Sequence, residues 1–62
     1  MTKEQFDNQE WHKGMMVRVF GHNTPRNCHV AGIDFNRRVI RTEDITGKRR
    51  YVSYMTCIVI GE

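Results

Sequence analysis

After the first dozen residues, apolar and polar side chains alternate with a period of two. In residues 15–20 (MMVRVF), one face of an extended segment would carry Met15, Val17 and Val19. This period is typical of a half-buried β-strand. Residues 21–27 (GHNTPRN) then combine Gly, Pro and Asn, which favour loops, so we expect the first strand to end at Phe20.

Residues 28–35 (CHVAGIDF) are also apolar, but they do not alternate regularly. Val30 and Ile33 are three positions apart, whereas Ile33 and Phe35 are two apart. A β-bulge at Gly32 would place all three on one face, because glycine tolerates the conformation that a bulge needs. We therefore expect one long, bent strand here, followed by a tight turn at residues 36–37.

The rest of the chain predicts three more strands, at residues 38–43 (RVIRTE), 49–55 (RRYVSYM) and 57–60 (CIVI). Gly47 suits the positive φ angle of a short hairpin loop at residues 44–48. A single 3₁₀ turn is expected around Ser53–Thr56. Closely spaced hydrophobic runs without a helical period favour an antiparallel meander of strands.

A polar arm, residues 1–13, precedes the strand-forming domain of residues 14–62. Thr2 and Gln5 have the spacing of a helix capping box, which predicts one or two helical turns. Such a helix would lay Phe6 and Trp11 over an open end of the domain. An arm that stays irregular would instead expose these two aromatic residues as an apolar patch that could bind a partner.

The order GMMVRVF, VAGIDF, RRVIRTED, GKRRYVSYM and CIVI resembles the small Src-homology-3-like barrels, which include the Tudor, KOW and Sm-type modules. The resemblance covers about residues 14–60 and implies a mostly all-β fold, a five-stranded antiparallel barrel. Such barrels include peptide binders, RNA and DNA binders and oligomeric rings, so the fold alone does not choose a function. The predicted core comprises Met15, Val17, Val19, Val30, Ile33, Phe35, Ile40, Val52, Ile58 and Ile60.

Size and charge narrow the functional classes. A domain of 62 residues has a small core, and a pocket that enclosed a substrate would compete with that core for apolar residues. We therefore expect no enzyme and no small-molecule substrate.

No run reaches the roughly 18 apolar residues of a membrane span, and the polar N-terminus lacks a secretory signal, so the cytoplasm is the expected location. The net charge of +3 combines an acidic arm with a basic body, which is compatible with an anionic partner.

The cysteines and histidines do not form a recognisable catalytic or metal-binding motif. Cys28 and Cys57 are far apart in sequence and are expected to be reduced, buried thiols, although a barrel could bring them together as a disulfide. Cys28 and His29 are adjacent and would point to opposite faces of a strand. The other candidate ligands are His12 and His22. We expect no metal and no other cofactor.

Basic residues gather on the third and fourth predicted strands and their turns, and this suggests an RNA or DNA interface. Cationic side chains there would contact phosphates and release counterions. The rings of Tyr51, Tyr54, Phe20 and Phe35 could stack on bases. The alternative is an ordinary solvated basic face. The predicted nucleic-acid-binding residues are Arg37, Arg38, Arg41, Lys48, Arg49, Arg50 and Tyr51.

Protein interaction or self-association is the second hypothesis. The last predicted strand lies almost at the end of the sequence and could add a strand from a peptide or from a second copy of the chain. The residues that would serve this function are Phe6 and Trp11 in the arm, and Ile58 and Ile60 in the last strand.

Overall fold

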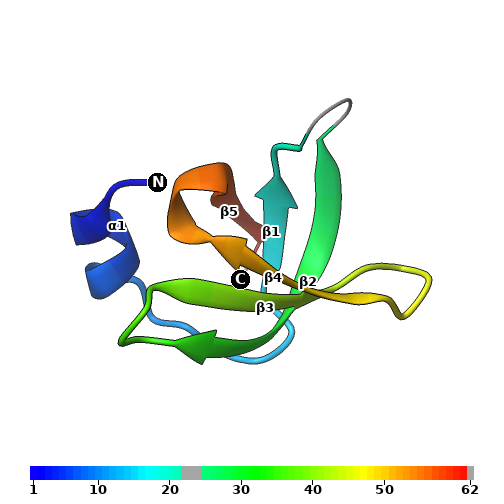
Figure 1. Ribbon diagram of the computed structural model, residues 1–62, viewed down its shortest axis with the longest axis horizontal. Coiled ribbons are helices and arrows are strands. Elements are labelled where there is room, and N and C mark those ends of the chain that lie inside the picture. The colour runs from blue at the N-terminus through cyan, green and yellow to red at the C-terminus, as the bar shows by residue number, and fades with distance from the viewer. Residues whose placement is uncertain (22–24, 62) are drawn as a thin grey trace.

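A computed structural model describes residues 1–21 and 25–61 and shows one short helix and five strands. The elements, in chain order, are α1 (Lys3–Asn8), β1 (Met16–Val19), β2 (Arg26–Asp34), β3 (Val39–Glu43), β4 (Arg49–Ser53), the 3₁₀ turn η1 (Tyr54–Thr56) and β5 (Cys57–Gly61). All neighbouring strands are antiparallel, in the order β4-β3-β2-β1-β5. The predicted five antiparallel strands, the 3₁₀ turn and the N-terminal helix are confirmed (Figure 1). Positions 22–24 of the expected 21–27 loop lie outside the described residues.

Strand β2 is the longest strand and pairs with different neighbours along its length. Arg26–His29 pairs with β1, whereas His29–Asp34 pairs with β3. The register with β3 shifts between Val30 and Gly32, so the predicted bulge is confirmed. Its physical reason differs from the expected one, because Gly32 is not among the glycines with positive φ, which are Gly14 and Gly47.

The bulge has a glycine because a side chain at this position would clash with a neighbouring residue, and not because of the backbone conformation. A Cβ atom at Gly32 would overlap the guanidinium of Arg41, its cross-strand partner on β3. Arg41 can therefore lie directly over the backbone of β2. At Gly47 the φ angle is +83°, so the predicted positive φ of the hairpin loop is confirmed.

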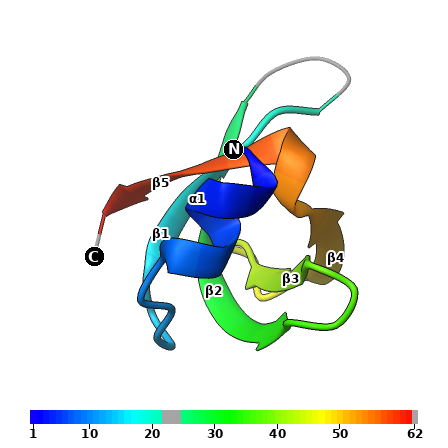
Figure 2. The ribbon, with the colours of Figure 1, turned by 90° about the vertical axis from the view of Figure 1, so that its left-hand side faces the viewer.

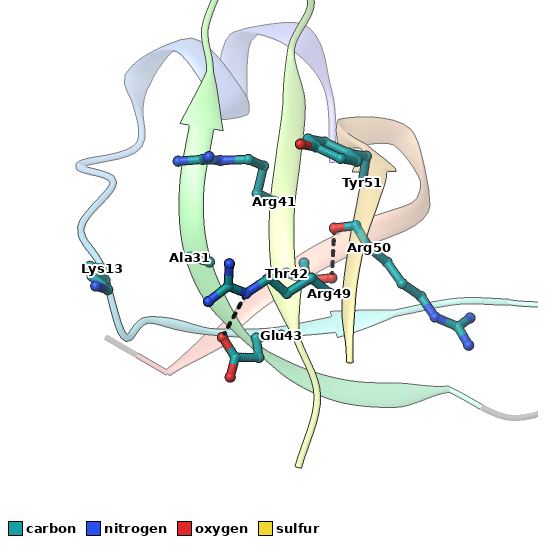
Figure 3. Close-up of a pocket in the computed structure, with 8 residues that line it drawn as sticks. All are labelled: Lys13, Ala31, Arg41, Thr42, Glu43, Arg49, Arg50 and Tyr51. Atoms are coloured by element: carbon teal, nitrogen blue, oxygen red, sulfur yellow. Dashed lines mark hydrogen bonds and ion pairs between the residues drawn. The ribbon is translucent and has the colours of Figure 1, made fainter. Parts of the chain in front are cut away.

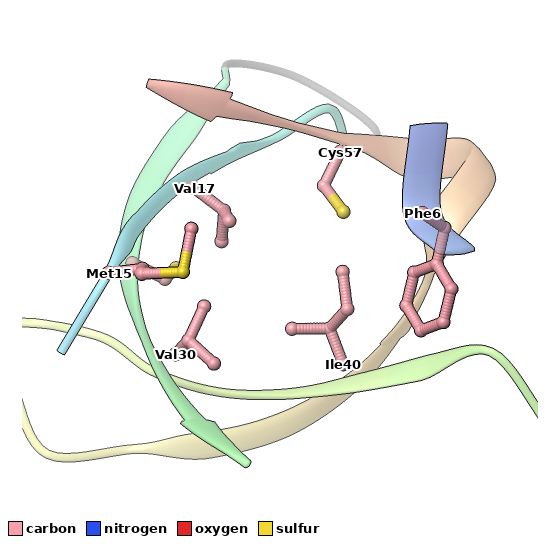
Figure 4. Close-up of a cluster of buried hydrophobic side chains, with 7 residues drawn as sticks. Phe6, Met15, Val17, Val30, Ile40 and Cys57 are labelled. Carbon is pink, nitrogen blue, oxygen red and sulfur yellow. The ribbon is translucent and has the colours of Figure 1, made fainter. Parts of the chain in front are cut away.

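The core lies on the concave side of the curled sheet, where strands surround the buried side chains (Figure 4). Its buried apolar members are Phe6, Met15, Val17, Cys28, Val30, Ile40 and Cys57. Val19, Ile33 and Val52 pack against this cluster as partly buried residues. Most of the predicted core is thus confirmed.

The prediction of Ile58 and Ile60 as core residues is wrong, since they are 40% and 39% exposed. Cys57 is buried instead, and Val59 packs against the core. Every residue of CIVI is apolar, so composition does not reveal which alternate residues point inward. Pairing with β1 decides it, because Cys57 lies opposite Val19, which packs on the core, and Ile58 lies opposite Arg18.

Phe35 is the other predicted core residue that the structure places outside the core, with 63% of its surface exposed. The sequence predicted that Phe35 would lie on the same face of the strand as Val30 and Ile33. Strand β2 ends at Asp34, however, and Phe35 begins the turn that leads to β3. Strand alternation therefore no longer fixes the direction of its side chain.

The arm docks across one end of the curled sheet (Figure 2). Thr2 and Gln5 form the predicted capping box, and Phe6 is fully buried. The indole Nε1 of Trp11 donates to the carbonyl oxygen of Phe6 at 3.0 Å, and the two ring centroids are 5.3 Å apart. The Met1 ammonium also donates to the carbonyl oxygen of Cys57 at 3.0 Å, which ties the start of the arm to β5.

Candidate nucleic-acid interface

The β3–β4 hairpin carries the largest group of predicted site residues. Its register pairs Arg41 with Tyr51 and Glu43 with Arg49. Directly opposed residues in an antiparallel pair point to the same face, and here that face is convex and exposed because Ile40 and Thr42 point into the core. Arg41, Arg49 and Tyr51 therefore share one outer surface.

A shallow hollow of about 250 Å³ lies on this surface, and we call it the basic hollow. Lys13 brings a cation from the arm, where the chain enters the sheet (Figure 3). One carboxylate, Glu43, also lines it. The full lining comprises Lys13, Ala31, Arg41, Thr42, Glu43, Arg49, Arg50 and Tyr51.

The cations of the basic hollow are weakly paired. Arg49 Nε lies 3.6 Å from Glu43 Oε2, and the Arg49 side chain is 82% exposed. Such a solvent-exposed pair contributes little and is screened by salt. Lys13 and Arg41 make no ion pair with any other described residue. Positive charge on the outer face is thus available to an anionic ligand.

Arg50 lies apart from the other arginines of the hairpin. It pairs with Thr42, whose hydroxyl donates to the Arg50 carbonyl oxygen at 3.3 Å. Its side chain extends away from Arg41 and Arg49 (Figure 3). The alternation of β4 explains this, because residues 49 and 51 share one face and residue 50 points to the other. Arg50 thus contributes its guanidinium to a different part of the surface.

Lys48 lies in an ordered loop at the tip of the hairpin. Asp44 Oδ1 accepts hydrogen bonds from the backbone N–H groups of Thr46 and Lys48, at 2.9 and 3.0 Å. The Thr46 hydroxyl and these N–H groups hold the pKa of the Asp44 carboxyl below its usual value. Asp44 therefore organises the loop that presents Lys48.

The two arginines of the β2–β3 turn have different environments. Arg37 is exposed, and its backbone N–H donates to Asp34 Oδ1 at 3.1 Å. Arg38 lies on the side of the arm and binds Asp7 through Nε and Nη2, at 3.0 Å each. Of the two, Arg37 is the side chain that remains available to a ligand.

A second hollow adjoins the first, and we call it the aromatic hollow. It shares Arg41 and Tyr51 with the basic hollow and is otherwise lined by Ile33, Asp34, Phe35 and Asn36. Tyr51 is 75% exposed. The sheet surface thus carries two exposed rings and an arginine in one depression.

Sequence reasoning did not single out Lys13, and it placed Phe35 in the core as well as among the rings that could stack on bases. Lys13 is far from the hairpin in sequence, and only the path of the arm into β1 places it beside β2 and β3. The bulge at Gly32 predicts Phe35 on the core face, but its place next to the Asn36–Arg37 turn is a signal that it can leave the strand.

The cysteines are poorly suited to nucleophilic chemistry. Both are free and buried, on two strands that flank β1, so the possibility of a disulfide between them is not realised. Burial raises the pKa of the Cys28 thiol and raises that of Cys57 to about 11. A thiol with a raised pKa is a weak nucleophile at neutral pH. Among residues 1–21 and 25–61, no three His, Cys, Asp or Glu side chains gather closely enough to hold a metal ion.

The residues of the protein-interaction hypothesis divide into two groups. Phe6 is a core residue, and Trp11 is partly buried against the core, so the docked arm does not present them as a patch. Ile58 and Ile60 are partly exposed on β5, which is the last strand in the sheet order. Only the second group lies on an accessible surface.

Comparisons with known proteins found no matching family model, no matching curated protein and no matching solved structure. In the described part of the chain, no helix has the length and apolar character needed to span a bilayer.

Proposed function

We propose that this protein binds nucleic acid through the outer face of the β3–β4 hairpin. The observation that carries the proposal is the common surface of Arg41, Arg49 and Tyr51, extended by Lys13 in the basic hollow. Cations spaced along a shallow surface suit the repeated charges of a phosphate backbone. The weak pairing of Arg49 and the absence of an ion pair at Lys13 and Arg41 among the described residues leave these charges available.

We also propose that the curled sheet is a small Src-homology-3-like barrel. The order β4-β3-β2-β1-β5 puts the consecutive strands β4 and β5 at opposite ends of the sheet, and the short turn η1 joins them. Three residues can connect those ends only if the sheet curls until they approach each other. The barrel architecture would keep the hairpin face convex and accessible.

The affinity for nucleic acid should fall with salt. If Lys13, Arg41 and Arg49 each neutralise one phosphate of a single strand, the slope of log affinity against log salt is about −2, and raising salt from about 50 to 200 mM weakens binding roughly 20-fold. A fluorescently labelled ten-nucleotide strand and a labelled duplex, titrated with the protein and followed by anisotropy, would measure this slope.

The decisive variant combines Arg41→Ala and Arg49→Ala. Its matched control combines Lys3→Ala and Arg26→Ala, which removes the same charge from exposed residues that line neither hollow. The hairpin variant should lose affinity and have a shallower salt slope, whereas the control should retain most of both. Equal losses in both variants, or no binding by the wild type at about 50 mM salt, would refute the proposal.

A second candidate function is protein interaction through β5. β4 and β5 are the two ends of the sheet order. Exposed cations on β4 disfavour pairing with a strand from another chain, whereas β5 carries the partly exposed apolar residues Ile58 and Ile60. Sedimentation velocity of the wild type and of Ile58→Lys would test self-association. A concentration-dependent dimer that the variant loses supports this function, and a wild-type monomer at high concentration argues against self-association.

A further inference from the structure

We propose that the ligand of this surface is a single-stranded nucleic acid whose bases stack on Tyr51 and Phe35 while its phosphates contact Arg41 and the basic hollow. This inference rests on the proposed function and makes it more specific. It is carried by the aromatic hollow, where two exposed rings and one guanidinium come together from three separate segments.

Tyr51 is the first of the two stacking surfaces. It lies in the middle of β4, opposite Arg41, and is 75% exposed. Its hydroxyl has no hydrogen-bond partner among the described residues. A tyrosine on a sheet has few rotatable bonds, so it can offer a ring to a base at low entropic cost. Stacking of this kind needs no particular sequence, because every base has a flat face.

Phe35 is the second stacking surface, and the core holds it in place. Its ring meets the ring of buried Phe6 at a centroid distance of 6.1 Å and an interplanar angle of 62°. This edge contact anchors the phenylalanine, yet 63% of its surface stays exposed. An exposed ring fixed by a buried ring is ordered before the ligand arrives, which reduces the cost of binding.

Arg41 selects for an anionic partner. The lack of a side chain at Gly32 lets the Arg41 guanidinium lie close to β2, and Arg41 lines both hollows. A cationic ligand, such as a methylated lysine held between aromatic rings, would be repelled by this charge. A ligand with both flat aromatic groups and negative charges satisfies the rings and the guanidinium together, and nucleic acids have both.

The accessibility of the bases decides between single and double strands. In a duplex the bases are already stacked and paired, and their faces are not available to Tyr51 or Phe35. In a single strand they can turn outward onto the rings while the backbone continues into the basic hollow, since the two hollows share Arg41 and Tyr51. The bases and phosphates used here are common to RNA and DNA.

The test compares affinities for dT10, U10 and a ten-base-pair DNA hairpin at about 50 mM salt, for the wild type and for Tyr51→Ala, Phe35→Ala and Tyr51→Phe. The matched control is Phe20→Ala, which removes an exposed ring that lines neither hollow. Circular dichroism melts would verify that each variant is folded. Phe35→Leu replaces Phe35→Ala if loss of the contact with Phe6 unfolds the domain.

We expect dT10 and U10 to bind more tightly than the hairpin. Tyr51→Ala and the Phe35 variant should each weaken single-strand binding roughly 5- to 150-fold, while Tyr51→Phe and Phe20→Ala stay near the wild type. Equal affinity for the hairpin, together with losses no larger than that of Phe20→Ala, would overturn the stacking inference. If the Arg41 and Arg49 variant still lost binding in that case, the proposed function would stand; if no probe bound at all, both would fall.

Discussion

Arg38 donates from Nε and Nη2 to the two carboxylate oxygens of Asp7, each at 3.0 Å. The two residues are 31 positions apart, and the contact joins α1 to the last residue of the turn before β3. Arg38 therefore serves to hold the arm, although the sequence suggested that it belongs to a nucleic-acid interface. A two-point pair also restricts how the helix lies across the end of the sheet.

The Asp7–Arg38 pair predicts a pH-dependent contribution to stability. The hydrogen bond from Arg38 holds the pKa of the Asp7 carboxyl below its usual value. A lowered native pKa gives stability that is present above the ordinary aspartate pKa and is lost as pH falls through the lowered one. Asp7→Asn should thus lower the melting temperature slightly at pH 7, and its difference from the wild type should vanish in strong acid.

The control for this pair is Glu10→Gln, which neutralises an exposed carboxylate of the same arm that makes no ion pair with the described residues. Thermal melts at several pH values would measure all three proteins. A difference between Asp7→Asn and the wild type that did not change with pH would contradict a role for the ionised carboxylate.

Phe6→Ala should severely destabilise the domain. Phe6 is fully buried and contacts the rings of Trp11, Phe35 and Tyr54. Its loss therefore leaves a cavity between the arm and the sheet. Such a change costs about 3–5 kcal/mol, comparable with the whole stability of a domain of this size. Urea unfolding should show Phe6→Ala largely unfolded, with Phe6→Leu folded and Phe20→Ala close to the wild type.

Gly32→Ala should affect the Arg41 side chain more than the fold. The new Cβ would meet the guanidinium end of Arg41, which is flexible and can move, and the φ angle of Gly32 is not in the positive region. We expect a melting temperature close to that of the wild type and a weaker affinity for dT10. A large loss of stability would show that the bulge itself requires glycine.

Stability should fall at alkaline pH because of Cys57. Burial raises the pKa of its thiol to about 11, whereas a thiol in the unfolded chain ionises near 8.5. Between these values the unfolded state has released its proton and the native state has not, so the free energy of unfolding decreases by up to about 1.4 kcal/mol per pH unit. Urea unfolding from pH 8 to 11 would measure this decrease.

Cys57→Ala is the control for the alkaline prediction, because it removes the thiol but leaves the other groups that titrate in this range. The variant should lose stability less steeply than the wild type above pH 8.5. Identical pH profiles for the two proteins would contradict the assignment of the effect to Cys57.

Local signals in the sequence determined most of the secondary structure. The alternation after Gly14, the irregular spacing around Gly32, the glycine at position 47 and the Thr2–Gln5 pair predicted strands, bulge, hairpin and helix cap that the structure confirms. These features depend on steric preferences and hydrogen bonds between residues close in sequence, so the order of residues is enough to reveal them.

Tertiary structure decided which residues of an all-apolar strand point into the core, and which charged side chains lie close together. Pairing with β1 turned Cys57 inward and Ile58 outward in a run where every residue is apolar. The docked arm took Arg38 into an ion pair and brought Lys13 to the hairpin. These outcomes depend on contacts between segments far apart in the chain, and local hydrophobicity carries no information about such contacts.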